Sequence, residues 1–172
     1  MDDAPAEPVD ADLVEAFVSA SRALVAVAVR SLGAGDADIT LPQHRILVLL
    51  AAHGPQRISD LATLLGVNGS TATRHCDRLQ RRGFIRRDPA PDDRRAVRVA
   101  LTEAGARLVR QITDARRREI SRILQAMPAR SRPPLLAALR SFADAAGEVP
   151  EQSWSLGWGT DSTGSSRPTP TR

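Results

Sequence analysis

Residues 68–83 read NGSTATRHCDRLQRRG and combine a helix-capping asparagine, small hydroxyl side chains and several arginines with few apolar residues. If a helix starts after Asn68, then Ala72, Cys76 and Leu79 fall at positions i, i+4 and i+7 and form one narrow apolar stripe. The remaining helix surface then carries Ser70, Thr71, Thr73, Arg74, Asp77, Arg78 and Arg81. The pattern predicts a short helix that packs on one side and presents hydroxyl and guanidinium groups on the other.

The residues before this helix predict a second short helix. Ser59 is expected to cap a helix over residues 60–65, and Gly66 to end it. The helix that carries the arginines is expected to run over residues 69–82 and to end at Gly83. Two short helices joined by a turn of three or four residues that contains glycine are typical of a helix-turn-helix.

A β-hairpin is predicted after the helix-turn-helix. Residues 84–87 read as one strand, and residues 96–101 as a second strand in which apolar and polar side chains alternate. The sequence DPAPDD, residues 88–93, is typical of a turn. The hairpin therefore has a charged tip, which includes Arg94 and Arg95.

Four longer helices are predicted outside this region. They span residues 11–31, Pro42 to the Gly54-Pro55 stop, the cap Thr102 to about Met127, and a last helix opened by Ser131 and Pro133. The first helix carries a seam of apolar residues at alternating spacings of four and three, namely Leu13, Phe17, Ala20, Leu24 and Val27. This seam and the leucine-rich last helix expose more apolar surface than one lobe of this size covers alone, so the pattern predicts a homodimer.

The basic residues are all arginines: Lys and Arg together number 24, lysine does not occur, and the formal net charge is +4. Between Arg57 and Arg98 the chain carries ten arginines against five aspartates. Guanidinium groups pair well with phosphates and guanine edges, and a polar helix of this kind fits the DNA major groove. The region therefore predicts binding to double-stranded DNA that weakens as salt rises. For any single arginine, a solvated surface position is the alternative.

Other classes of site are not predicted. Cys76 is the only cysteine, which excludes an intramolecular disulfide framework and a thiolate zinc cluster. His44, His53 and His75 lack metal-ligand spacing, and no P-loop, G-x-G-x-x-G or G-x-S-x-G run occurs. We therefore expect no metal, no cofactor and no enzymatic activity. The longest apolar run, residues 23–29, is too short to span a bilayer, so a soluble cytoplasmic protein is expected.

Both ends of the chain are predicted to be disordered tails. Residues 1–9 are acidic and contain proline, and residues 149–172 are rich in Ser, Thr, Gly and Pro. Neither segment carries enough apolar surface to offset chain entropy. Trp154 and Trp158 lie in the second tail and are interpreted as incidental aromatic residues, although docking of either one is left open.

The stretch from Ile58 to Gly105 resembles the winged helix-turn-helix of the MarR family of bacterial transcriptional regulators, and the similarity extends over residues 10–147. Its most specific part is the wing sequence DDRRAVRVALTEAG. There, Asp93 and Arg95 match the family's Asp-x-Arg pattern, and Leu101-Thr102 match its closing Leu-Thr.

The resemblance implies a mainly α fold with a small β-hairpin wing, in which a winged helix-turn-helix is joined to a helical dimerisation region. The dimerisation region would comprise residues 10–35 and 104–147, and the DNA-binding lobe residues 40–102. Arg95 would enter the minor groove, and Asp93 would orient neighbouring arginines. The DNA-binding residues expected in total are Ser70, Thr71, Thr73, Arg74, Arg78, Arg94 and Arg95.

The resemblance also implies a ligand-responsive repressor that binds a pseudo-palindromic operator as a homodimer. A small lipophilic or anionic effector would occupy an apolar cleft between the dimerisation region and the DNA-binding lobe. His44 stands where relatives often carry an aromatic or other bulky residue, so the shape and polarity of this cleft are expected to differ.

Two alternatives remain open. The first is a winged-helix interaction module whose arginine-rich face binds an acidic protein instead of DNA. The second is a redox-sensing regulator that uses Cys76. The inward position of Cys76 favours a small, unreactive core residue over this second reading.

Overall fold

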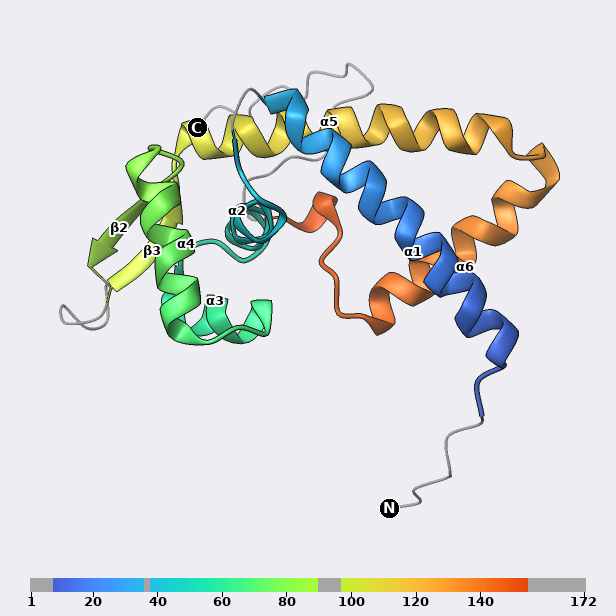
Figure 1. The fold of residues 1–172 in the computed structure, drawn as a ribbon, viewed down its shortest axis with the longest axis horizontal. Coiled ribbons are helices and arrows are strands. Elements are labelled where there is room, and N and C mark those ends of the chain that lie inside the picture. Colours follow the sequence, from blue (N-terminus) through green and yellow to red (C-terminus); the bar gives the residue numbers. More distant parts are fainter. Residues whose placement is uncertain (1–7, 36–37, 90–96, 155–172) are drawn as a thin grey trace, which may run out of the picture.

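The computed structural model describes residues 8–35, 38–89 and 97–154. In these segments helices predominate, and three short strands form one antiparallel sheet. A lobe of short helices and strands lies at one end, and longer helices extend away from it (Figure 1). This arrangement confirms the expected fold class, a mainly α protein with a winged helix-turn-helix.

The element boundaries follow the sequence patterns closely. The lobe contains α2 (Leu41–His53), α3 (Ile58–Leu65) and α4 (Gly69–Arg81), with the strands β1 (Gln56–Arg57), β2 (Ile85–Pro89) and β3 (Val97–Leu101). The extended part contains α1 (Ala11–Leu32), α5 (Glu103–Ala126) and α6 (Arg132–Ala145). Single 3₁₀ turns occur at η1 (Gly33–Gly35), η2 (Ala129–Ser131) and η3 (Glu151–Ser153).

Side-chain caps start four of the helices and explain where they begin. Each cap accepts a hydrogen bond from a backbone N–H of the first turn that has no partner within the helix. The caps are Asp10 for α1, Thr40 for α2, Asn68 for α4 and Thr102 for α5. Thr40 and Gln43 form a full capping box, in which the Thr40 N–H donates to Gln43 Oε1 at 3.0 Å.

The predicted cap of α3 is wrong. The helix begins at Ile58, so Ser59 lies inside its first turn and Arg57 takes the N-cap position without a side-chain cap bond. Ser59 Oγ donates to Asp60 Oδ1 at 3.2 Å instead. The physical reason is that Gln56 and Arg57 pair with β3, so the strand ends directly at the start of the helix.

The sheet contains one strand that the sequence patterns did not predict. The strand order is β1-β3-β2, and both pairings are antiparallel. Ile85 lies opposite Leu101 and Pro89 opposite Val97, as expected for the wing hairpin, while Gln56 pairs with Val99 on the other side of β3. A strand of two residues has too little sequence to show an alternating pattern.

The core of the molecule lies in the lobe. Its most buried side chains include Ile46, Leu47 and Leu50 from α2, Leu61 from α3, Leu79 from α4, Val99 from β3, and Val109 and Ile112 from α5. The first half of α5 therefore belongs to the lobe by packing, while its second half extends beyond it (Figure 1).

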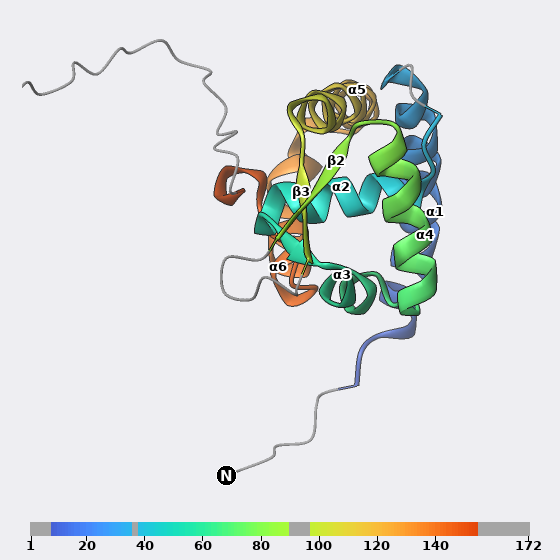
Figure 2. The same cartoon turned by 90° about the vertical axis from the view of Figure 1, so that its left-hand side faces the viewer.

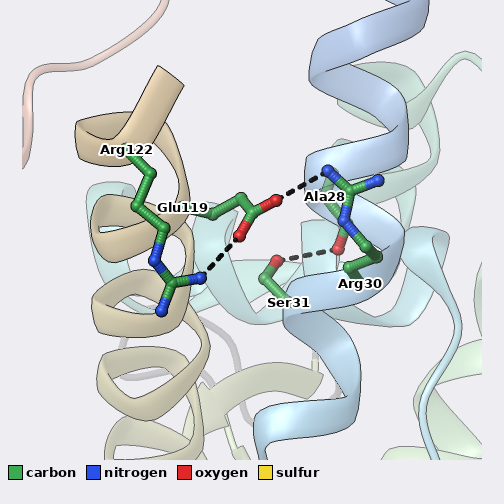
Figure 3. A network of polar contacts seen from close by, with 5 residues as sticks. All are labelled: Ala28, Arg30, Ser31, Glu119 and Arg122. Carbon is green, nitrogen blue, oxygen red and sulfur yellow. Dashed lines mark hydrogen bonds and ion pairs between the residues drawn. The ribbon is translucent and has the colours of Figure 1, made fainter. Parts of the chain in front are cut away.

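In the extended part, α1 packs along α5, and Val27, Ser31 and Leu32 of α1 are buried. Glu119 of α5 lies between two guanidinium groups, with Arg30 Nη2 of α1 at 2.8 Å and Arg122 Nη1 at 3.2 Å (Figure 3). The ring of Phe17 on α1 stacks on the ring of Phe142 on α6, and the ring centroids lie 4.6 Å apart. Among the described helices, none combines the length and the hydropathy that a membrane-spanning segment requires.

Large apolar side chains stay exposed on the extended helices. They include Leu13, Val14, Val18, Leu24, Val25 and Val29 on α1, Ile123 on α5, and Leu136, Leu139 and Phe142 on α6. Leu13 and Leu24 of the predicted seam are 50% and 52% exposed in the single chain. Helix α6 has no buried residue. Large apolar side chains that stay exposed in such number on a few helices are typical of a protein interface.

The expectation of a disordered tail from residue 149 is wrong for the part of it that the structure describes. Trp154 is only 7% exposed and belongs to the hydrophobic core, and Val149 packs against the same core. The average composition of residues 149–172 is polar, so it gives no sign that Val149 and Trp154, which lie at the start of this segment, pack at the core. Trp158 and the N-terminal residues 1–7 lie outside the described residues.

Candidate DNA interface and ligand cleft

Helix α4 packs on the lobe through the stripe that the sequence predicts. Ala72 and Cys76 are 0% exposed and Leu79 is 1% exposed. The helix follows α3 after a short turn and contacts both α2 and α3. Figure 2 looks onto the lobe and shows α4 along one side, beside β2 and β3.

The exposed side of α4 carries the predicted polar groups in a hydrogen-bonded arrangement. Asn68 Oδ1 accepts from the Thr71 N–H and from Ser70 Oγ, both at 2.8 Å. Thr73 Oγ1 donates to the Gly69 carbonyl at 2.8 Å, and Arg74 Nη2 donates to Thr71 Oγ1 at 3.0 Å.

These bonds orient the first turn of α4 before any partner binds. Arg74 is exposed and uses one of five guanidinium N–H groups in its bond to Thr71. Its four other N–H donors are sufficient to bind a phosphate or the O6 and N7 atoms of a guanine. Ser70, Thr71, Thr73 and Arg74 are thus brought together at the N-terminal end of one helix, as predicted.

An ion pair that the sequence patterns did not reveal joins α4 to the wing. Arg87 Nη2 of β2 lies 2.5 Å from Asp77 Oδ1 of α4. Both side chains are partly buried, so the pair is less screened than a fully exposed one. It fixes the hairpin relative to α4, and a helical wheel alone, which placed Asp77 on the exposed side, gives no sign of this partner.

The C-terminal half of α4 adds positive charge at the same surface. Arg78, Arg81 and Arg82 line a groove of about 350 Å³ with residues that lead into α2. The Arg82 guanidinium lies 5.6 Å from the centre of the Phe84 ring and donates to the Asp38 carbonyl oxygen. Arg78 is exposed, which agrees with its predicted position on the outer side of the helix.

The wing is described only up to its tip. In β2, Arg86 Nε pairs with Asp88 Oδ2 at 2.7 Å. Residues 90–96 lie outside the described residues. The roles expected for Asp93, Arg94 and Arg95 therefore stay predictions.

Cys76 has the surroundings of a core residue. It is fully buried, and desolvation raises the pKa of its thiol to about 11. A thiol with so high a pKa holds little thiolate at neutral pH, which counts against the redox-sensing alternative. Among the described residues, no group of three or more His, Cys, Asp or Glu side chains is arranged to hold a metal ion.

A cleft of about 390 Å³ lies between the extended helices and the lobe. Its walls come from α1, α2, α3, α4 and α5. The lining residues are Ala28, Leu41, Pro42, His44, Arg45, Leu65, Val67, His75 and Arg116. Five of these nine residues are apolar.

Three nitrogen atoms on the walls of this cleft are buried without a hydrogen-bond partner among the described residues. They are His44 Nε2, His75 Nδ1 and Arg116 Nε. Buried polar atoms are nearly always hydrogen-bonded, so each of these three atoms lacks a partner that a folded protein normally supplies. The family resemblance places His44 near this cleft, but the separation of His75 and Arg116 from it along the chain gives no sign of a common site.

Burial shifts the pKa values of two groups at the cleft. His44 is 4% exposed, and burial, with the nearby Arg116 and Arg45, lowers its pKa to about 4. The imidazole is therefore neutral at pH 7. Burial also lowers the pKa of Arg116, but guanidinium groups stay protonated in proteins. Arg116 consequently contributes a positive charge to a cleft that Arg45 and the two histidines also line.

Comparison with known proteins assigns this fold and surface to a family. A model of the MarR family matches residues 39–97, which include the helix-turn-helix and most of the wing. The transcriptional repressor NicR of Pseudomonas putida is 31% identical over 109 residues, which is 63% of this chain and 69% of NicR. This chain belongs to the MarR family.

Other MarR-type relatives agree with this assignment. The HTH-type transcriptional regulator YfiV of Bacillus subtilis is 35% identical over 101 residues, which cover 55% of this chain and 63% of YfiV. The crystal structure of RV1404 from Mycobacterium tuberculosis is 43% identical, has a TM-score of 0.78, and is matched over 84% of this chain and 99% of that chain. The matches cover between 47% and 63% of the length of three of the curated relatives.

Proposed function

We propose that this MarR-family chain is a homodimeric transcriptional regulator that binds a pseudo-palindromic operator in double-stranded DNA, acts as a repressor and works in the cytoplasm. The observation that carries the proposal is the geometry of α4. Its apolar stripe is buried, and its hydroxyl and guanidinium groups face outward in a preorganised first turn. A relative of this family, NicR, is named as a repressor.

We assign residues 10–35 and 104–147 to dimerisation, with the first half of α5 packed on the lobe, and residues 40–102 to DNA binding. The exposed apolar side chains of α1 and α6 support this division, because they lie on the extended helices and not on α4. In a symmetric dimer, two copies of α4 would then reach successive major grooves about one DNA turn apart.

DNA binding is tested by fluorescence anisotropy with duplexes tiled across the DNA upstream of the chain's own gene. We expect one duplex to bind at least about 1,000-fold more tightly than a random duplex of equal length. The affinity should fall linearly with the logarithm of salt concentration. Equal affinity for all duplexes would refute specific regulation, and salt-sensitive capture of an acidic protein without a DNA footprint would support the interaction module.

We further propose that the cleft between the extended helices and the lobe binds a small, largely apolar monoanion, whose carboxylate or phenolate group lies near Arg116 and the two histidines. The volume of about 390 Å³ and the three unpartnered nitrogen atoms support this ligand class. Some relatives are named for resistance to antibiotics or organic hydroperoxides, which is compatible with small-molecule responses.

The ligand proposal is tested by calorimetric titration with benzoate, using cyclohexanol as an uncharged probe of similar size. We expect benzoate to bind more tightly than cyclohexanol and to lose that advantage in Arg116→Met. Arg107→Met is a matched control, because Arg107 lies on the same helix and pairs with Glu103 outside the cleft. Equal binding of both probes, or the same loss in the control, would contradict an anion site.

A further inference from the structure

The segment that follows α6, residues 147–154, lies across the molecule and is here named the strap. Helix α6 ends where Gly147 takes a positive φ of 68°. The Gly147 N–H donates to the Asp144 carbonyl and the Glu148 N–H to the Ala143 carbonyl, both at 3.0 Å. This is a Schellman-type end, which turns the chain sharply. In Figure 1 the strap returns from α6 to the side of α2.

Two ion pairs tie the strap to the lobe and to α5. Both carboxylate oxygens of Glu148 accept hydrogen bonds from the Arg45 guanidinium, at 2.8 and 2.7 Å. These hydrogen bonds with Arg45 hold the pKa of Glu148 below its ordinary value. Arg117 of α5 pairs with Glu151. A bidentate pair restricts orientation as well as distance.

An aromatic anchor ends the strap. Trp154 is 7% exposed and packs in the hydrophobic core of the lobe. Its Nε1–H donates to the Val149 carbonyl at 3.0 Å, so the strap closes on itself around the buried ring. Val149 packs against the same core. The strap is therefore bound to the lobe by apolar burial as well as by charge.

Helix α6 itself is held loosely by comparison. None of its residues is buried, and its aromatic contact is the stacking of Phe142 on Phe17 of α1. The strap begins directly at the end of α6, within three residues of Ala145, and its far end lies in the lobe core. It consequently connects the helix that carries exposed apolar residues to the lobe that carries α4.

We propose that the strap fixes the orientation of α6 relative to the DNA-reading lobe, with Glu148 and Trp154 as positioning residues. The consequence for DNA recognition rests on the proposed function. In a dimer joined through α1 and α6, the strap sets the separation of the two α4 helices and thus the operator spacing that the dimer recognises. It gives the C-terminal segment a role in specificity, although none of its residues needs to touch DNA.

The orientation is measured directly by spin-label distances within one protomer. Labels are placed at Gln80→Cys on α4 and Ala137→Cys on α6, both exposed positions, and the labelled protein is diluted into an excess of unlabelled chain. Cys76 is fully buried, and the chain without the two new cysteines controls for its labelling. This distance reports the lobe relative to α6 whether or not the chain dimerises or binds DNA.

Three strap variants and one matched control are compared. We expect a narrow distance distribution in the parent, in the conservative Trp154→Phe, and in Glu103→Gln, which removes a Glu–Arg salt bridge with one hydrogen bond within α5. Glu148→Gln and Trp154→Ala should broaden the distribution about twofold or shift its centre, because the oriented state loses its fixed contacts. Circular dichroism identifies folded samples, and Glu148→Gln, a surface change, keeps the test valid if Trp154→Ala does not fold.

Unchanged distributions in folded Glu148→Gln and Trp154→Ala would overturn the inference and leave the proposed function intact. If the parent chain shows no specific DNA binding, the proposed function is overturned, but the distance result is unaffected. Once an operator is identified, duplexes with one or two extra central base pairs provide a second readout. The parent should discriminate against them, and Glu148→Gln should discriminate less; equal discrimination would contradict the inference.

Discussion

Arg74 is the residue from which we expect sequence readout. It is exposed in the first turns of α4 and is oriented by its bond to Thr71. Arg74→Ala should lower affinity for the operator about 10- to 100-fold, in line with the loss of one bidentate base contact, and should change affinity for random duplex much less. Parallel anisotropy titrations measure both. Arg107→Ala, on α5, is the control, and an equal loss on both duplexes would make Arg74 a phosphate contact instead.

Arg95 is expected to act differently, because the resemblance to the family places it at the wing tip and in the minor groove. Arg95→Ala should weaken binding to all duplexes and reduce the slope of log affinity against log salt by about 1. A salt series from low to physiological concentration measures this slope. If slope and affinity both stay as in the parent, Arg95 does not contact DNA.

His44 makes stability depend on pH. Its folded pKa of about 4 lies below its ordinary value of 6.5, so the unfolded state takes up the proton first as pH falls. The stability that neutral His44 permits is thus fully present above pH 6.5 and is lost as pH falls towards 4. The loss amounts to about 3 kcal/mol for a shift of this size.

Urea unfolding between pH 7.5 and 4 tests this prediction. We expect His44→Leu to remove this part of the pH dependence, while His53→Leu, at an exposed histidine, keeps it. A pH profile that is the same in His44→Leu and the parent would show that His44 titrates normally. The pKa of the Glu148 carboxyl is lowered, so the stability that this group contributes is lost only as pH falls below the ordinary pKa of a glutamate. This loss occurs at lower pH than that of His44, so the two effects can be separated.

At the scale of elements, the junction between the wing and α5 depends on a glycine. A Cβ at Gly105 would overlap the Phe84 carbonyl oxygen and would lie 3.0 Å from Leu101 Cδ1. The close approach matters because the Thr102 N–H also donates to that carbonyl, at 3.0 Å. The start of α5 and the start of β2 therefore hold each other in position.

Gly105→Ala should lower the free energy of unfolding by about 1 to 3 kcal/mol, the usual cost of overpacking. Gly33→Ala is the matched control, since its Cβ would meet nothing within 4 Å and its φ is −66°. Chemical denaturation of both variants measures the difference. Similar stability of the two variants would show that the backbone at Gly105 yields at little cost.

The elements of the lobe could be predicted because their signals are local. Asn68 caps α4 by a bond to the Thr71 N–H, and the stripe of Ala72, Cys76 and Leu79 is buried as its spacing requires. The predicted start of α3 is wrong because a serine near a helix start resembles an N-cap whether or not its side chain accepts a hydrogen bond from the first turn. What decides its start, the pairing of Gln56 with Val99, comes from a distant strand.

At the scale of the whole molecule, the apolar face of α1 and α6 determines the expected assembly. Leu139→Glu places a charge on this face, where Leu139 is 43% exposed in the single chain. We expect this variant to be monomeric in analytical ultracentrifugation, because burying an unpaired carboxylate in an interface is costly. Leu64→Glu changes an equally exposed leucine on α3 and should remain dimeric. A dimeric Leu139→Glu would place the interface elsewhere.

Local sequence patterns are sufficient to predict the lobe: the two short helices, the hairpin, the polar face of α4 and the core position of Cys76. Helical period, capping residues and glycine stops act over a few residues, so they are readable without coordinates. Three features follow from tertiary packing instead: His44, His75 and Arg116 line one cleft, Arg87 pairs with Asp77, and Trp154 lies in the core. These groups are separated by 10 to more than 70 positions along the chain, and no local periodicity relates them. Packing of distant segments is what brings them together.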